Sequence, residues 1–476
     1  MAKPRVLILG GCGFVGRNLV EYLVDNEFCS KIRVADKVPT QTAWLNEKHK
    51  ECFEKVEFKS ANLVNPANMD RVFDDADGGW DFVFNLAAET KYGQTDEVYH
   101  ERVFMITQNA AQEAAKRGVK RFIEVSTAQV YNSDKDVSTE SSKVSPWTAI
   151  AKFKLKAEEE LAKTAGLNYV IVRPAVIYGV GDRLSLTPRL IIGAVYKQLQ
   201  EVMKLLWTKD LRINTVHVTD VCRALWHLRD ASESGQVFNL ADKTDTSQGV
   251  VSELVSQIFG IKHDYVGSVM SNLAKVNMSS VVEDSNEKHM VPWADACQKD
   301  NIENTPLSPF LDQELLYNKH LHIDGSKIEG TGFSYEVPQI TEGKLREVGH
   351  RSFFDIFFLR TIYSCRKVGC SHTSARVNDT LFRITFLACF MDNISPCLVV
   401  RSNSLCIYFT HETVLCHCMN TLSPLSDNSH SAFGSYPVCA WSEMAGVPLF
   451  YLPAWVATNY LALCDVNQLC DLNPNI

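Results

Sequence analysis

Residues 5–16 read Arg5-Val6-Leu7-Ile8-Leu9-Gly10-Gly11-Cys12-Gly13-Phe14-Val15-Gly16, and this stretch decides the fold. Its apolar first half predicts a short buried strand of a parallel sheet, and residues 17–25 carry apolar side chains at helical spacing. The glycines at 10, 13 and 16 lie between the two. A tight strand-to-helix turn, the approach of a pyrophosphate and close helix packing each require one of them. The N-terminus of the helix would attract the phosphate charge.

A second strand is predicted over residues 31–35 and ends at Asp36, twenty residues beyond Gly16. A carboxylate at this point can accept hydrogen bonds from an adenosine ribose and would repel a 2′-phosphate. The spacing therefore predicts NAD as the cofactor in preference to NADP. Lys37 tempers the preference because a neighbouring cation offsets part of the repulsion, and a solvated loop acid is the alternative interpretation of Asp36.

The alternation of strand and helix continues to residue 172. Further strands are predicted at 56–59, 81–85, 121–125 and 169–172, and helices at 69–74, at 106–117 and up to 161–164. This pattern predicts an α/β fold of the Rossmann type, a doubly wound parallel sheet with its ligand site at the carboxyl ends of the strands. We expect an NAD-binding domain over residues 1–180, a smaller α/β substrate domain over 181–347 that is partly interleaved with it, and a separate tail over 348–476.

Five motifs follow one another between residues 5 and 346. They are the three glycines, Asn85-Leu86-Ala87-Ala88, the segment Val125-Ser-Thr-Ala-Gln-Val-Tyr131, the segment Arg173-Pro-Ala-Val-Ile-Tyr-Gly179, and Val216-His-Val-Thr-Asp-Val221. In this order they resemble the extended short-chain dehydrogenase/reductase family, which includes nucleotide-sugar epimerases and dehydratases and 3β-hydroxysteroid-type dehydrogenases. The resemblance implies NAD-dependent oxidoreductase or epimerase chemistry at an alcohol or carbonyl group.

In the family that the chain resembles, a Ser or Thr, a Tyr and a Lys act together. The Tyr hydroxyl exchanges a proton with the substrate, the Lys lowers the pKa of the Tyr and binds the nicotinamide ribose, and the Ser or Thr orients the substrate oxygen. The resemblance gives these roles to Thr127 and to Lys154. The tyrosine position, four residues before Lys154, is Ile150, which has no exchangeable proton.

Two interpretations of Ile150 stay open. Another hydroxyl could replace the missing one, and Tyr92 and Tyr131 are the candidates by position, although the family often has a packed tyrosine at the position of Tyr131. Alternatively, the domain binds NAD without redox chemistry, as a regulatory or scaffold protein. Lys154 keeps a use as a ribose ligand in both cases.

The resemblance also implies a set of residues that contact NAD. They are Gly10, Gly13, Phe14, Val15, Gly16, Asp36, Lys37, Asn62, Leu63, Leu86, Ala87, Ala88, Lys154 and Pro174. The expected substrate is a small molecule: a sugar nucleotide, a sterol or a similar compound. Ala128-Gln129 stands where 4,6-dehydratases carry an acid pair, and the Asn214 spacing is closer to the hydroxysteroid branch. Arg189 and Arg212 are candidates for reaching a phosphate.

The composition changes near residue 348. The last 127 residues hold ten of the fifteen cysteines but only fifteen Asp, Glu, Lys and Arg. Three interpretations compete for this tail: a metal-binding or disulfide-rich appendage around Cys406, His411, Cys416, His417 and Cys418, a membrane anchor over residues 444–464, or sequence never selected to fold, such as the product of a mis-spliced message. We favour the third because the tail has no sustained periodicity.

The whole chain has a formal net charge of −8 with 46% hydrophobic and 22% charged residues. This acidity argues against a nucleic-acid partner, which would require a basic face. The N-terminus lacks the apolar core of a signal peptide, so a cytoplasmic protein is expected, with a homodimer as a candidate assembly and no membrane association. No metal site is predicted, because His320 and His322 share one side of a segment without a third ligand.

Overall fold

The computed structural model describes residues 2–230, 233–348, 398–401, 405–409 and 414–418. These residues fall into two units of the chain, 1–362 and 363–476. The first unit contains every predicted site residue. Within the described residues, no helix combines the length and the apolar character needed to cross a bilayer.

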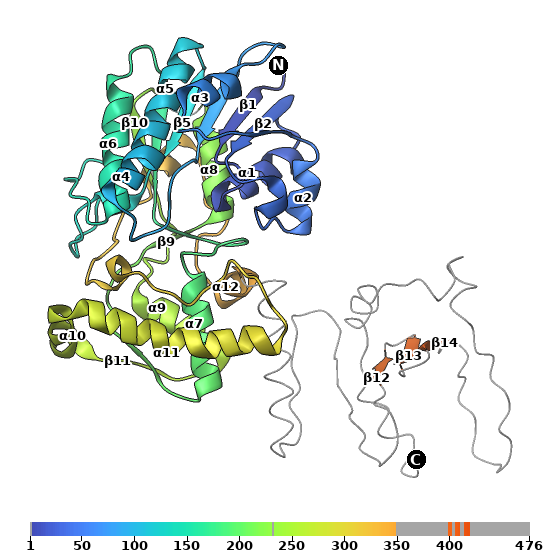
Figure 1. Cartoon of the computed structure of the whole chain (residues 1–476), viewed down its shortest axis with the longest axis vertical. Helices are drawn as coiled ribbons and strands as arrows, with labels where there is room; N and C mark the ends of the chain where they lie inside the picture. The colour runs from blue at the N-terminus through green and yellow to red at the C-terminus, as the bar shows by residue number, and fades with distance from the viewer. Residues whose placement is uncertain (1, 231–232, 349–397, 402–404, 410–413, 419–476) are drawn as a thin grey trace, which may run out of the picture. The chain divides into compact units, whose positions relative to one another are not determined.

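A seven-stranded sheet in the order β10-β6-β5-β4-β1-β2-β3 organises the first unit (Figure 1). Every neighbouring pair is parallel. The strands are β1 (Arg5–Leu9), β2 (Lys31–Asp36), β3 (Glu57–Ser60), β4 (Phe82–Asn85), β5 (Arg121–Val125), β6 (Tyr169–Pro174) and β10 (Gln236–Leu240). The order reverses between β1 and β4, which makes this the switch point where such sheets bind ligands. The predicted doubly wound parallel sheet is confirmed.

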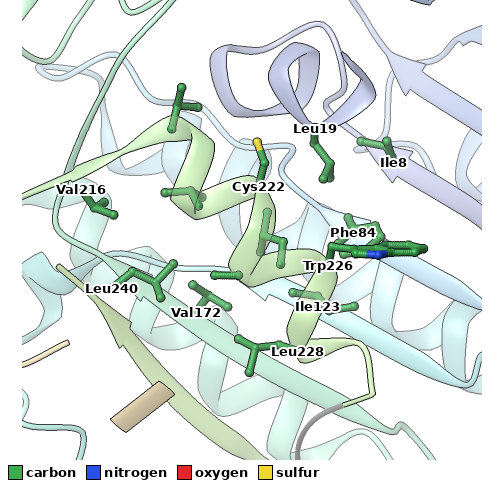
Figure 2. Close-up of a cluster of buried hydrophobic side chains, with 14 of the residues drawn as sticks. Ile8, Leu19, Phe84, Ile123, Val172, Val216, Cys222, Trp226, Leu228 and Leu240 are labelled. Atoms are coloured by element: carbon green, nitrogen blue, oxygen red, sulfur yellow. The ribbon is translucent and has the colours of Figure 1, made fainter. Parts of the chain in front are cut away.

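Side chains of each strand alternate between two buried layers. On β1, Val6 and Ile8 join one core and Leu7 and Leu9 the other. The first core is covered by α1 (Phe14–Asp25) and α8 (Val218–Leu228), and the second by α3 (Pro66–Phe73) and α5 (Ile106–Lys116). Figure 2 shows Cys222, Trp226 and Leu228 of α8 over the strand residues Phe84, Ile123, Val172 and Leu240.

Several boundaries differ from the predicted ones for local reasons. Helix α1 begins at Phe14, because Gly13 is its extended N-cap residue. Helix α3 begins at Pro66, where proline is favoured in the first turn, and the Asn65 side chain caps it by accepting from the Ala67 N–H. Strand β10 joins the sheet from the second half of the chain, and its partner β6 extends to Pro174. None of the expected strands corresponds to β10.

Smaller elements complete the first half. Helix α6 (Ala149–Lys163) packs beside α5, and α2 (Glu47–Phe53) packs beside α1. A short α4 (Asp96–Tyr99) continues through the π-helical segment η2 (His100–Met105) into α5. Short 3₁₀ turns lie at η1 (Thr40–Thr42) and η3 (Ala128–Val130), and two more follow in the second half at η4 (Gln313–Leu316) and η5 (Lys327–Thr331).

The second half builds another core beyond the carboxyl edge of the sheet. Two parallel strand pairs lie here, β7 (Val176–Tyr178) with β9 (Thr215–His217) and β8 (Met203–Leu205) with β11 (His263–Tyr265). The helices are α7 (Thr187–Leu199), α9 (Gln248–Phe259), α10 (Gly267–Val276), α11 (Met278–Lys299) and α12 (Glu342–Val348). Leu190, Val195 and Val255 are among the buried residues that hold α7 and α9 together. The domain boundary at residue 180 remains a prediction.

Three short strands are described in the second unit, where no strand was expected. They form one antiparallel sheet, β12 (Leu398–Arg401), β13 (Leu405–Phe409) and β14 (Val414–Cys418). Within it Cys406 is paired with His417 and Ile407 with Cys416. His411 and the segment 444–464 lie outside the described residues, so the three interpretations of the tail remain hypotheses.

Candidate functional site

One large cavity of about 1070 Å³ runs from the switch point of the sheet into the second half. Its volume exceeds that of a usual single-ligand pocket, so a cofactor and a substrate can share it. All the predicted NAD contacts line it, from the glycine-rich loop to Pro174, together with Thr127, Ile150 and Tyr92. The structure therefore brings together every residue predicted for NAD binding or catalysis except Tyr131.

The glycine-rich loop has the shape that a pyrophosphate needs. Gly10 has φ +77, and a Cβ there would lie 2.6 Å from the backbone of Ala87, so only glycine fits between β1 and β4. A Cβ on Gly16 would lie 2.5 Å from the Gly10 carbonyl oxygen, so α1 can approach the loop only without a side chain. No side chain caps the first turn of α1. Its first backbone N–H groups thus remain available to an anion in the cavity.

Asp36 is held rigidly at the end of β2. One carboxylate oxygen accepts from the Cys12 N–H at 3.0 Å and the other from the Val38 N–H at 2.9 Å. Each oxygen keeps a further lone pair for a ribose hydroxyl. Burial raises the pKa of Asp36, and the two backbone bonds oppose that rise. Lys37, next to it, lines the same cavity.

Asn62 and Leu63 line the cavity directly after β3. The Asn62 side-chain oxygen accepts from the Val64 N–H at 3.3 Å, and its amide nitrogen has no acceptor among the described residues, so it can donate to a ligand. Leu63 is buried and joins the core below α3 and α5. Leu86, Ala87 and Ala88 line the cavity after β4.

Lys154 lines the cavity, and two residues of β5 hold its ammonium group by hydrogen bonds. Its Nζ donates to Glu124 Oε1 at 3.1 Å and to the Val125 carbonyl oxygen at 2.6 Å. Glu124 is fully buried, and it also accepts from Asn85 and Thr107. Burial raises the pKa of Glu124. An ammonium carries three protons, so Lys154 retains one for a ligand.

Thr127 and Ile150 lie in the cavity wall where the resemblance places them. Ile150 is 8% exposed and belongs to an apolar cluster with Tyr99, Val103 and Phe153. Tyr92 packs against this same cluster. Tyr92 and Ile150 thus line the same cavity and share one apolar cluster.

Tyr92 is tied to the start of α6 by two side chains that the sequence analysis did not identify. Its hydroxyl accepts from Gln129 Nε2 at 2.8 Å, and Gln129 Oε1 accepts from the Thr148 hydroxyl at 2.8 Å. Burial raises the pKa of Tyr92 to about 12. The one feature of the sequence that drew attention to either of these two residues was that Gln129 stands where related dehydratases carry an acid.

Tyr131 does not reach the cavity, and its candidacy as the substitute hydroxyl is therefore wrong. It is 1% exposed, donates to Asn239 Oδ1 at 2.8 Å and accepts from Arg173 at 2.9 Å. Arg173 in turn pairs with Glu158. The hydroxyl is thus satisfied inside the core, in the packed role that was its alternative interpretation.

The far half of the cavity is mostly apolar. Its walls come from α7, α9, the segment 203–213 and the segment 311–321, with Ile192, Met203, Trp207, Leu211, Val255 and Leu316 among the lining side chains. Arg189 lines it and has no ion pair among the described residues, while Arg212 pairs with Asp245 and does not line it. Arg183, which the sequence analysis did not single out, also lines the cavity, and burial lowers its pKa.

The two titratable residues of the motif at 216–221 have local partners. His217 is buried, its Nδ1 accepts from the Thr219 N–H at 3.3 Å, and burial lowers its pKa to about 4. Asp220 accepts from the Glu336 and Val337 N–H groups. In the described part of the chain, no group of three or more His, Cys, Asp or Glu side chains is arranged to hold a metal ion.

Comparison with known proteins gives the family of this site. Residues 6–241 match the model of the NAD dependent epimerase/dehydratase family. A 4-hydroxy-2-methyl-3-oxo-4-farnesyl-3,4-dihydroquinoline-1-oxide ketoreductase of Stigmatella aurantiaca is 25% identical over 280 residues, which are 57% of this chain and 78% of the relative. The decarboxylating sterol-4-alpha-carboxylate 3-dehydrogenase of Saccharomyces cerevisiae is 26% identical, with 51% of this chain and 71% of the relative covered.

Among solved structures, the UDP-glucose 4-epimerase of Thermus thermophilus in complex with NAD shares the fold. The TM-score is 0.53 at 17% identity, over 74% of this chain and 99% of that one. Residues 6–241 therefore belong to the NAD-dependent epimerase/dehydratase family within the extended short-chain dehydrogenases/reductases, and the cofactor of this chain is NAD.

Proposed function

We propose that the chain is an NAD-dependent oxidoreductase that interconverts an alcohol and a carbonyl group, with the Tyr92 hydroxyl in the role that Ile150 cannot fill. One observation carries the proposal. Tyr92 lines the same cavity as Thr127 and Ile150, and its hydroxyl proton has no acceptor among the described residues. A proton that is free to enter a ligand cavity is what a general acid requires.

Each part of the site then has a task. The first turn of α1 binds the pyrophosphate, Asp36 binds the adenosine ribose, and Lys154 offers its third proton to the other ribose. Thr127 orients the substrate oxygen. Bound NAD supplies or accepts a hydride, while Tyr92 gives or receives the proton.

The apolar far half of the cavity supports a substrate with a large apolar part over a sugar nucleotide. Hydroxyl groups of a sugar would lose hydrogen bonds to water against Ile192, Met203 and Val255, and the polar lining residues of this half, such as Gln248, Ser252 and His289, are fewer than the apolar ones. Two of the relatives are named for a farnesylated ketone and for a sterol. We therefore propose a sterol-like or prenylated small-molecule carbonyl compound, with a sugar nucleotide as the second candidate because of Arg189.

The test begins with NAD binding by calorimetry and proceeds to a panel of steroid ketones, prenylated ketones and UDP-sugars. Tyr92→Phe should lower turnover by about 10²–10⁴-fold, the usual worth of general acid–base help, and leave NAD affinity within about twofold. Tyr131→Phe is the matched control, since it removes a phenol outside the cavity. It should lower stability by about 1–3 kcal/mol and leave turnover intact.

Equal turnover of Tyr92→Phe and the original chain would refute the role of Tyr92. If the chain binds NAD tightly and turns over no member of the panel, the regulatory or scaffold hypothesis replaces this one.

A further inference from the structure

A chain of hydrogen bonds leads from the N-terminus of α6 to Tyr92. Thr148 is the N-cap residue of α6, and its Oγ1 accepts from the Ala151 N–H at 3.2 Å. The Thr148 hydroxyl donates to Gln129 Oε1, and Gln129 Nε2 donates to the Tyr92 oxygen. Thr148 lies 19 residues after Gln129, and Gln129 lies 37 residues after Tyr92, so three separate segments of the chain meet at one cavity wall.

The direction of this chain is fixed at its buried end. A backbone N–H can only donate, so Thr148 must accept from Ala151. Thr148 is fully buried, and among the described residues its proton finds only Gln129 Oε1 as an acceptor. If the Gln129 amide were flipped, its NH₂ group would face the Thr148 hydroxyl, whose proton would then have no acceptor. An unsatisfied buried hydroxyl costs free energy. Gln129 therefore presents its NH₂ group to Tyr92.

We infer that Thr148 and Gln129 are positioning residues that force the Tyr92 hydroxyl to accept from behind and to donate into the cavity, so that the resting site is set to protonate a carbonyl oxygen. The inference rests on the role of Tyr92 in the proposed function. In such a reduction the carbonyl carbon gains the hydride of the reduced nicotinamide. The carbonyl oxygen gains the Tyr92 proton, and the phenolate regains a proton from water.

The reverse reaction needs Tyr92 to give up its proton first. Burial favours the neutral phenol, while the Gln129 bond stabilises the phenolate. Glu314, Asp312 and Tyr99 also face Tyr92 and disfavour the phenolate. Lys152 lies near Glu314, and Glu314 Oε1 accepts from the Ala149 N–H. Alcohol oxidation is therefore expected to speed up with rising pH, whereas carbonyl reduction does not need that step.

Gln129→Glu tests the direction with almost no change of shape. A carboxylate can only accept, so it takes protons from both Thr148 and Tyr92 and turns the Tyr92 proton away from the cavity. When Glu at position 129 is protonated, its O–H can replace the lost Nε2 donor. Gln198→Glu is the charge control, because Gln198 is an exposed residue of α7 outside the cavity wall.

The first readout is independent of catalysis. The full chain is labelled with carbon-13 at the tyrosine Cζ, and the Tyr92 resonance is identified by its loss in Tyr92→Phe. At neutral pH this resonance should move in Gln129→Glu, return toward its original position as the pH falls, and stay in place in Gln198→Glu. An unchanged resonance in Gln129→Glu overturns the inference, whatever the turnover measurements give.

The second readout is reductive turnover on the best carbonyl substrate of the panel. Relative to the original chain at the same pH, Gln129→Glu should lose about 10²-fold or more at neutral pH and recover as the pH falls. The ratio cancels the titration of Glu314, which both proteins share. Thr148→Ser keeps the hydroxyl and should retain turnover, whereas Thr148→Val should lose part of it. A pH-independent loss in Gln129→Glu would indicate a purely structural role and overturn the inference.

Discussion

Asp36 should make the chain discriminate strongly against NADP. The carboxylate is 8% exposed and fixed by the Cys12 and Val38 N–H groups, so it cannot swing away from a 2′-phosphate. A phosphate of about −1.5 charge at roughly 5 Å and an effective dielectric constant of about 20 gives a repulsion of ~5 kcal/mol. If Lys37 offsets about half of this repulsion, ~2–3 kcal/mol remains, which is roughly a 30- to 150-fold preference for NAD.

Calorimetric titration of both cofactors at low ionic strength measures this preference. Asp36→Asn removes the charge and keeps one acceptor, so the ratio of the two Kd values should fall to within a few-fold of one. In the original chain the preference should also weaken as the pH falls toward the raised pKa of Asp36, because only the ionised form repels phosphate. Equal Kd values for NAD and NADP in the original chain would refute the argument and identify Lys37 as the dominant contact.

Two further predictions concern Lys154 and Ile150. Lys154→Met leaves the Glu124 carboxylate buried without its cation, so the free energy of unfolding should drop by about 3–5 kcal/mol. It should decline further as the pH rises, because the pKa of Glu124 is raised in the folded chain and its ionisation therefore disfavours the fold. Urea unfolding at several pH values measures this loss, and adding Glu124→Gln should recover most of it. Ile150→Tyr puts a hydroxyl one helical turn before Lys154. Added to Tyr92→Phe, it should raise turnover about 10-fold or more above that of Tyr92→Phe alone, without altering NAD affinity. A double variant as inactive as Tyr92→Phe would contradict this geometry.

The cofactor half of the site could be predicted from the sequence because its determinants are local. The strand, the three glycines and Asp36 follow one another within 32 residues, and each has a backbone reason for its position. The absence of a hydroxyl at Ile150 was readable for the same reason, from the spacing to Lys154 on one helix.

The rest depends on contacts between distant segments. Nothing in the local sequence shows that Glu124 binds Lys154, or that Thr148 and Gln129 orient Tyr92, because these bonds require the packing of β5, α6 and the loop after β4. Tyr131 was ambiguous until Asn239 and Arg173 were seen to satisfy its hydroxyl. Strand β10 was missed because its neighbour in the sheet, β6, lies more than sixty residues earlier.

The placement of α8 and β10 limits where the polypeptide chain can be divided. Helix α8 covers one face of the sheet, and β10 pairs with the edge of β6, yet both follow the first 180 residues (Figure 2). A polypeptide that stopped at residue 180 would leave Val172 and Ile123 without their cover from α8, and it would turn β6 into an edge strand that keeps only β5 as a neighbour. We therefore expect that the nucleotide-binding half does not fold by itself, and that any insertion, circular permutation or split-protein fusion has to keep residues 218–240 with it.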